Sequence, residues 1–121
     1  MVENQHVQFW IENAVLHCIY KKNCIITLEA AKVVIALRLQ LQEGKSYPCI
    51  CYVLDGSSVF MPEARKYLAK HGNEGIDKLA LITTSSVKAV IANLYIAIDK
   101  PNKPARLFTN RENALKWLEL A

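Results

Sequence analysis

The fold is decided by the stretch YPCICYVLDGSSVFMPEAR, residues 47–65. Residues 47–54 are apolar on both alternating faces, which indicates a strand that is covered on both sides. Pro62 suits the first turn of a new helix, because its missing N–H would have no partner there anyway. In α/β sheets, ligands and regulatory contacts gather outside the carboxyl ends of strands. We therefore expect a functional site in the hydroxyl-rich loop between strand and helix, which consists of Asp55, Gly56, Ser57 and Ser58.

Alternating strand and helix patterns extend over the rest of the chain. We expect strands at residues 6–11, 14–20, 47–54, 78–83 and 105–108, and helices at about 27–43, 62–70, 87–98 and 110–120. Glu12-Asn13 suits a tight hairpin between the first two strands. The order ββαβαβαβα predicts one α/β domain, residues 1–121, with a mainly parallel five-stranded sheet, an N-terminal hairpin and four helices.

The helices carry recognisable ends and apolar stripes. Thr27 suits the N-cap of the first helix, Gly44 its left-handed end, and Thr109 with Glu112 forms a capping box before the last helix. We expect the first helix to bury Ala30, Val33, Val34, Leu37 and Leu41, with Lys32, Arg38, Gln40 and Gln42 as its polar cover. The third helix should bury a face that includes Val87, Val90 and Tyr95.

Both helices carry additional apolar residues outside these stripes. Three interpretations are open: a homodimer interface, a groove for a lipid-like ligand, or packing within the monomer. The candidate interface residues are Leu28, Ile35 and Leu39 on the first helix and Ala92 and Ile96 on the third.

Composition limits the class of protein. The chain has 121 residues, of which 52% are hydrophobic and 21% charged, and its net charge is +4. This is typical of an ordinary globular domain without a basic face dense enough for nucleic acid. The longest apolar segments are too short for a membrane span, and Met1 is not followed by a signal-peptide pattern. We therefore expect a cytoplasmic protein with reduced cysteines and no transmembrane segment.

Two motifs resemble a known family. Residues 63–68 read EARKYL and residues 100–109 read KPNKPARLFT, which is similar to small uncharacterised bacterial proteins with the SpoIIAA-like or STAS domain (sulphate transporter and anti-sigma factor antagonist). This resemblance implies the SpoIIAA-like fold over nearly the whole chain. It also implies that a serine at the start of the second helix is phosphorylated, but here Glu63 or Ala64 stands at that place. This departure from the family argues against a phosphorylation switch. Two interpretations of the Glu63 carboxylate at the helix N-terminus are open: it could imitate the phosphorylated state, or it could simply stabilise the helix through its interaction with the helix dipole.

Two hydroxyl clusters should lie at strand carboxyl ends. The first is the loop 55–58, and the second contains Thr84, Ser85 and Ser86. Together with helix N-termini they could hold phosphate or a nucleotide, whereas the simpler interpretation is turn and cap chemistry. Ser57 or Ser58 could also replace the missing phosphoacceptor, unless they are ordinary loop serines.

No constellation of catalytic residues is apparent. Cys18, Cys24, Cys49 and Cys51 could be imagined as a metal site, but strand cysteines among apolar residues are typical of a hydrophobic core, and Cys49 and Cys51 should share one face. The three histidines lie in separate elements without ligand spacing. We expect no enzyme activity, no cofactor and no bound metal.

The sequence thus predicts a non-enzymatic regulatory module. It would recognise another protein, or a second copy of itself, and the recognition surface would consist of Asp55, Gly56, Ser57, Ser58, Glu63 and Arg65. The alternative is a carrier or sensor of a small apolar, lipid-like or anionic ligand, built from the same loops and the third helix.

Overall fold

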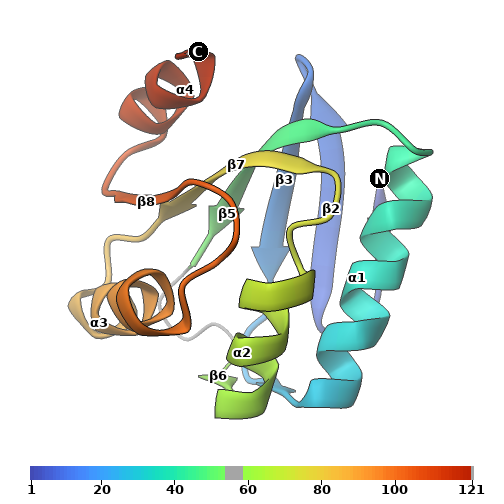
Figure 1. Ribbon diagram of the computed structural model, residues 1–121, viewed down its shortest axis with the longest axis vertical. Coiled ribbons are helices and arrows are strands. Elements are labelled where there is room, and N and C mark those ends of the chain that lie inside the picture. Colours follow the sequence, from blue (N-terminus) through green and yellow to red (C-terminus); the bar gives the residue numbers. More distant parts are fainter. Residues whose placement is uncertain (54–58, 121) are drawn as a thin grey trace.

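A six-stranded mixed sheet with the order β1-β2-β3-β5-β7-β8 forms the centre of the computed structural model, which describes residues 1–53 and 59–120 (Figure 1). The strands β1, β2 and β3 pair antiparallel, whereas β3, β5, β7 and β8 pair parallel. The bounds are β1 Val2–Glu3, β2 Val7–Glu12, β3 Val15–Tyr20, β5 Tyr47–Tyr52, β7 Ile76–Ile82 and β8 Ala105–Phe108.

The expected five-stranded, mainly parallel sheet is corrected on two points. The edge strand β1 adds a sixth strand, and a separate parallel pair, β4 (Ile25–Ile26) with β6 (Val59–Phe60), forms a small second sheet. Each of these extra strands has only two residues, which is too short for an alternating pattern to appear in the sequence.

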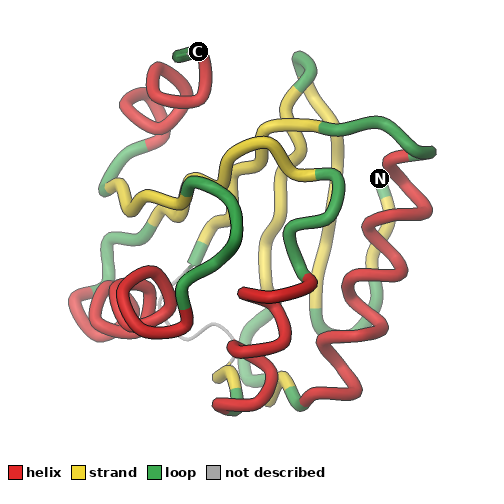
Figure 2. Tube along the Cα trace, viewed as in Figure 1, coloured by secondary structure: helices red, strands yellow, loops and turns green. Residues whose placement is uncertain are grey.

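The described residues form four α-helices, as expected. They are α1 (Leu28–Gln42), α2 (Pro62–His71), α3 (Ser86–Leu94) and α4 (Arg111–Glu119), and the chain continues from α3 into a π-helical turn, η1 (Tyr95–Asp99). Figure 2 shows these helices around the strands, with α4 standing apart from the other three. None of the helices in residues 1–53 and 59–120 is long and apolar enough to cross a membrane.

The helices cover the two faces of the sheet unequally. Residues of α1, α3 and η1 pack against one face, which presents Phe9, Cys18 and Leu81. Of the helices in the described residues, α4 alone packs against the opposite face, where its Ala114 and Leu118 meet Ile50, Ala80 and Ile82. The strand β5 is therefore covered on both sides, which confirms the prediction from its apolar sequence.

Local signals in the sequence explain most element ends. Asn13 and Ala14 join β2 to β3 with φ of 53° and 61°, as a two-residue hairpin turn requires. Thr27 is the N-cap of α1, where its Oγ1 accepts a hydrogen bond of 3.2 Å from the N–H of Ala30. The predicted capping box before α4 is wrong by one residue, because Asn110 is the N-cap and its Oδ1 accepts from the N–H of Asn113 at 2.8 Å.

The buried face of α1 differs from the predicted one. Its buried residues are Ala31, Val34, Ile35, Arg38 and Gln42, while Val33 is 57% exposed. Arg38 and Gln42, which we expected to face solvent, turn inward because backbone carbonyls of the turn after α2 accept their hydrogen bonds. Because α1 is apolar on several sides, tertiary contacts decide its orientation.

The orientation of α3 is also corrected. Val87 and Val90, predicted to be buried, are 68% and 61% exposed, whereas Lys88 and Ala92 face the interior. Lys88 and Ala92 are four residues apart and therefore lie on one side of the helix. The inward face of α3 thus combines a lysine with a small apolar side chain, and this places Lys88 in the candidate site.

Candidate functional site

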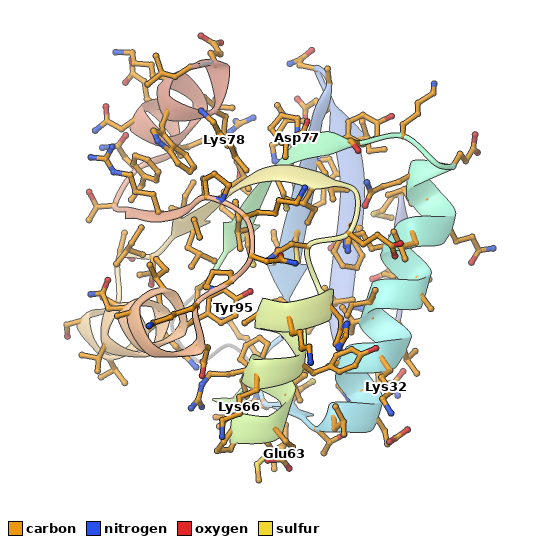
Figure 3. All side chains as sticks on the ribbon, viewed as in Figure 1. Lys32, Glu63, Lys66, Asp77, Lys78 and Tyr95 are labelled. Atoms are coloured by element: carbon orange, nitrogen blue, oxygen red, sulfur yellow. The ribbon has the colours of Figure 1, made fainter. Side chains whose placement is uncertain are left out.

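A cavity of about 120 Å³ lies between the sheet and the helices α1, α2 and α3. Alternate residues of the strands form its floor, among them Cys18, Cys51 and Leu81. The helices form its walls and contribute polar groups at a few positions, which are Arg38 from α1, Arg65 from α2, Lys88 from α3 and Tyr95 from η1. In Figure 3, Tyr95 lies in front of the sheet between α2 and α3. A mostly apolar cavity with a few polar side chains is the usual form of a small-molecule site.

Three thiols line the floor of the cavity. Cys49 and Cys51 share one face of β5, as predicted, and Cys18 lies opposite Cys51 on the neighbouring strand β3. All three are buried, and burial raises the pKa of the Cys18 and Cys49 thiols. Cys18 and Cys49 are therefore protonated at neutral pH, and all three buried side chains act as small apolar groups. Among the described residues, no group of three or more His, Cys, Asp or Glu side chains is arranged to hold a metal ion.

Arg38 crosses from α1 to the turn that follows α2. Its Nη1 donates to the carbonyl of Glu74 and its Nη2 to the carbonyl of Gly72, each at 2.8 Å. Its Nη1 also donates to Gln42 Oε1, and Gln42 in turn donates to the carbonyl of Gly75 at 2.8 Å. Burial lowers the pKa of Arg38, although a guanidinium remains charged at neutral pH. Arg38 therefore holds a positive charge at the cavity wall and fixes the turn 72–75 against α1.

Arg65 is paired with Asp99. Its Nε donates to Asp99 Oδ2 at 3.1 Å, and its Nη1 donates to the carbonyl of Phe60 at 3.3 Å. The Asp99 side chain is only 3% exposed, so the pair is largely removed from solvent. Breaking such a buried pair leaves an uncompensated charge, which is strongly destabilising. Arg65, which we predicted to recognise a partner, thus joins α2 to η1.

The charged side chains that line the cavity are cationic. Arg38, Arg65 and Lys88 belong to its lining, whereas no aspartate or glutamate is found among the lining residues in the described part of the chain. Asp99 offsets the charge of Arg65 from just outside the lining. Among the described lining residues, cationic side chains therefore outnumber carboxylates, and in a low-dielectric interior a ligand with a negative charge would interact favourably with them.

Two half-buried phenols, Tyr20 and Tyr95, and the buried amide of Asn73 complete the polar part of the described lining. Burial raises the pKa of Tyr20 and Tyr95 well above their ordinary value, so both hydroxyls remain protonated. Tyr20 packs its ring edge-on against Phe60 with a centroid distance of 4.7 Å, next to α2. A protonated phenol can donate a hydrogen bond to an anion or accept one from a neutral group.

The second predicted hydroxyl cluster has local partners. Thr83 is buried, and its Oγ1 accepts from the N–H of Ser85 at 3.1 Å. Ser85 Oγ accepts from the N–H of Lys88 at 3.2 Å, in the first turn of α3. Thr84 and Ser86 are exposed. These contacts match the simpler interpretation, in which the hydroxyls serve turn and cap chemistry.

The remaining predicted partner site is only partly within the described residues. Asp55, Gly56, Ser57 and Ser58 lie outside them, and so does any anion site that they would form with the hydroxyls after β7. Glu63 is exposed in the first turn of α2, where its negative charge interacts favourably with the positive end of the helix dipole. Recognition of a protein through this loop remains a prediction.

The five candidate interface residues do not form one exposed surface. Ile35 and Ala92 are buried within the monomer, at 8% and 5% exposure, and both line the cavity. Leu28, Leu39 and Ile96 are half-buried. For Ile35 and Ala92, the packing of the monomer itself covers the apolar side chain.

Sequence reasoning did not identify Arg38, Lys88 and Tyr95 as residues of a site. A signal for Arg38 was present, because Ala31, Val34, Arg38 and Gln42 continue one helical stripe at spacings of three and four residues. Polar members at the end of an apolar stripe indicate a buried hydrogen-bonded group. No comparable local pattern distinguishes Lys88, since most residues of α3 are apolar and do not define a single buried stripe.

Comparisons with known proteins assign the chain to a family. A family model described as "Domain of unknown function (DUF7793)" matches residues 9–120, so the chain belongs to that family. The chain is also similar in structure to an uncharacterized protein from the DUF3478 family with a SpoIIAA-like fold, from Shewanella loihica PV-4. The TM-score is 0.64 at 14% sequence identity, over 98% of each chain. No curated protein matches the sequence. The predicted SpoIIAA-like fold is thereby confirmed.

Proposed function

We propose that the chain is a non-enzymatic binding protein whose cavity holds a small apolar molecule with one anionic group, such as a short monocarboxylate. The proposal rests on the cavity of about 120 Å³, whose lining contains three cationic side chains and no carboxylate among the described residues. An apolar protein cavity of about 150 Å³ is known to stay dry and to bind benzene. The cavity therefore suits a small ligand of roughly six to nine non-hydrogen atoms.

The positions of the charges agree with such a ligand. Thiols and aliphatic side chains on the sheet would contact the apolar body, because the floor of the cavity presents Cys51 and Leu81 without a charged group. The anionic group would lie towards the helices, where Lys88 and Tyr95 belong to the lining. Charge-assisted hydrogen bonds are roughly twice as strong as neutral ones, so the anion would provide much of the specificity.

Titration with benzoate, followed by amide NMR, tests the proposal. We expect shifts of the amides around the cavity, for example those of Cys51, Leu81 and Ala92. Ala92→Leu adds three carbon atoms to the lining and should weaken binding at least tenfold, as about 1.4 kcal/mol corresponds to each factor of ten. Ala89→Leu is the matched control on α3, because Ala89 is half-buried and not part of the lining.

Benzyl alcohol provides the comparison for charge. We expect it to bind at least tenfold more weakly than benzoate, and Lys88→Met should reduce this difference. Thermal unfolding must show that each variant is folded. If benzoate shifts no amide of the lining at millimolar concentration, or if Ala92→Leu binds it like the wild type, the proposal is wrong.

Recognition of a protein by the start of α2 is a second candidate. Exposed apolar side chains lie beside Glu63: Val59 and Met61 precede it, and Ile25 pairs with Val59 in the small sheet. Ile25 and Val59 are 61% and 54% exposed. Capture of partners from the native cell with wild type and with Glu63→Lys would test this candidate. A partner that binds both forms equally would argue against it.

A further inference from the structure

A groove of about 580 Å³ lies on the outer surface between α1 and α2, and it shares only Ile35 and Asn73 with the described lining of the cavity. Ala36 and Leu39 of α1 and Tyr67 of α2 provide its apolar part. Lys70 and His71 from the end of α2, and Asn102 and Lys103 from the connector before β8, form its polar rim. The residues Ile35 and Leu39, which the sequence marked as a candidate interface, both belong to this groove.

The rim is held in place by backbone contacts. Asn102 Nδ2 donates to the carbonyl of Lys70 at 3.2 Å, and the N–H of Asn102 donates to the carbonyl of Ala69 at 3.2 Å. The connector is thus attached to the last turn of α2. Lys70 and Lys103 therefore lie on the same side of the groove.

The charges of the groove favour an acidic partner. No carboxylate of the described residues lies within 4.0 Å of the ammonium groups of Lys70 or Lys103. Lys32 lies near the groove, 5.8 Å from the centre of the Tyr67 ring, but Glu29 at 3.7 Å offsets its charge. Glu74 is the one acidic residue of the described lining, and its negative charge acts on the buried Arg38 behind it.

We propose that this groove binds an acidic amphipathic helix of a partner protein. A concave surface between two helices, with an apolar part and a charged rim, suits a helix that inserts apolar residues at spacings of three, four and seven. The groove is lined by the end of α2 from Tyr67 to His71, which extends over roughly 7.5 Å, so it contacts about one to two turns of such a helix. Asp and Glu side chains along its flanks would pair with Lys70 and Lys103.

Selection from a library of 16-residue peptides displayed on phage tests this proposal without a known partner. We expect the selected peptides to share apolar residues at helical spacing and an excess of Asp and Glu. The best peptide, made synthetically, should bind Lys70→Glu/Lys103→Glu at least tenfold more weakly than the wild type. Lys116→Glu is the matched control, because Lys116 is an exposed lysine on α4, on the other side of the sheet.

A second variant separates the groove from general electrostatic attraction. Leu39→Gln keeps every charge and removes an apolar contact, so it should also weaken binding of the peptide at least tenfold. Circular dichroism must show that this variant keeps its fold. The proposal is overturned if no peptide is selected, if the selected peptides are basic or extended, or if these variants bind like the wild type. Binding only to phosphatidylserine vesicles, or self-association lost in Leu39→Gln, would identify a membrane or a second copy as the occupant instead.

Discussion

His17 is the most buried titratable residue on the face of the sheet that α4 covers. It is 1% exposed, and its ring lies parallel to the rings of Trp10 and Tyr52 at centroid distances of 5.0 Å and 6.0 Å. Trp10 and Tyr52 are themselves 6.3 Å apart, so the three rings form a triangle and not a row. Burial lowers the pKa of His17, and the nearby Arg111 lowers it further.

This lowered pKa predicts that stability falls in mild acid. Above pH 7, His17 is neutral in both the folded and the unfolded chain. As the pH decreases below the ordinary value of about 6.5, the unfolded chain binds the proton first, so the free energy of unfolding decreases until the folded pKa is passed. Urea unfolding of wild type and His17→Phe between pH 8 and pH 5 measures this. Phenylalanine can stack like His17, but it cannot titrate and loses the contact of 3.3 Å between His17 Nδ1 and the Tyr52 hydroxyl. The difference in the free energy of unfolding between wild type and His17→Phe should therefore change with pH, and a difference that stays constant would contradict the lowered pKa of His17.

Gly75 is required for both its backbone conformation and its lack of a side chain. Its φ is +74°, and a Cβ atom would lie 2.9 Å from Nε2 of Gln42. Gly44 offers a matched comparison, because its φ is +78° but a Cβ there would meet no atom within 4 Å. We expect Gly44→Ala to cost about 1–2 kcal/mol from backbone strain alone. Gly75→Ala should cost about 1–3 kcal/mol more, since the buried amide of Gln42 must also move. If urea unfolding shows that Gly44→Ala and Gly75→Ala lower the free energy of unfolding equally, the contact with Gln42 does not contribute to the cost.

At the level of the element, the hairpin between β2 and β3 carries a residue in an unfavourable conformation. Ala14 has a φ of 61°, which costs an L-residue with a Cβ about 1–2 kcal/mol. Ala14→Gly should therefore raise the free energy of unfolding by up to about 1 kcal/mol, after the greater entropy loss of glycine is subtracted. Ala36→Gly, in the exposed middle of α1, should lower it by about 1 kcal/mol. A loss of stability in Ala14→Gly would contradict the turn geometry.

The helix α1 shows how a tertiary contact changes an element. Its sequence is apolar on several sides, so local periodicity permits more than one buried face. The face that includes Arg38 is chosen because the carbonyls of Gly72 and Glu74, more than thirty residues away, accept its hydrogen bonds. Without these partners a buried guanidinium would be prohibitively costly.

For the whole molecule, the cavity predicts a difference in thiol reactivity. Cys24 is half-buried, whereas Cys18, Cys49 and Cys51 are buried around the cavity. Iodoacetamide at pH 8 should add one label quickly, at Cys24, and three further labels only as the cavity opens or the protein unfolds. Intact mass against time measures the labels, and Cys24→Ser should lack the fast one. Two or more labels added at the same rate would show that the cavity is open to reagents.

The sequence alone determined the features that depend on neighbouring residues. The doubly covered strand β5, the start of α2 at Pro62, the cap at Thr27 and the alternation of strands and helices all follow from local patterns, and the resemblance to a family added the SpoIIAA-like fold. The tertiary structure alone decided the inward faces of α1 and α3, the two-residue strands β1, β4 and β6, and the cavity and the groove. The physical reason is that these features depend on which distant groups satisfy a buried charge or cover an apolar side chain. No local pattern distinguishes Lys88, and the helical stripe that includes Arg38 does not indicate which distant carbonyls, those of Gly72 and Glu74, accept its hydrogen bonds.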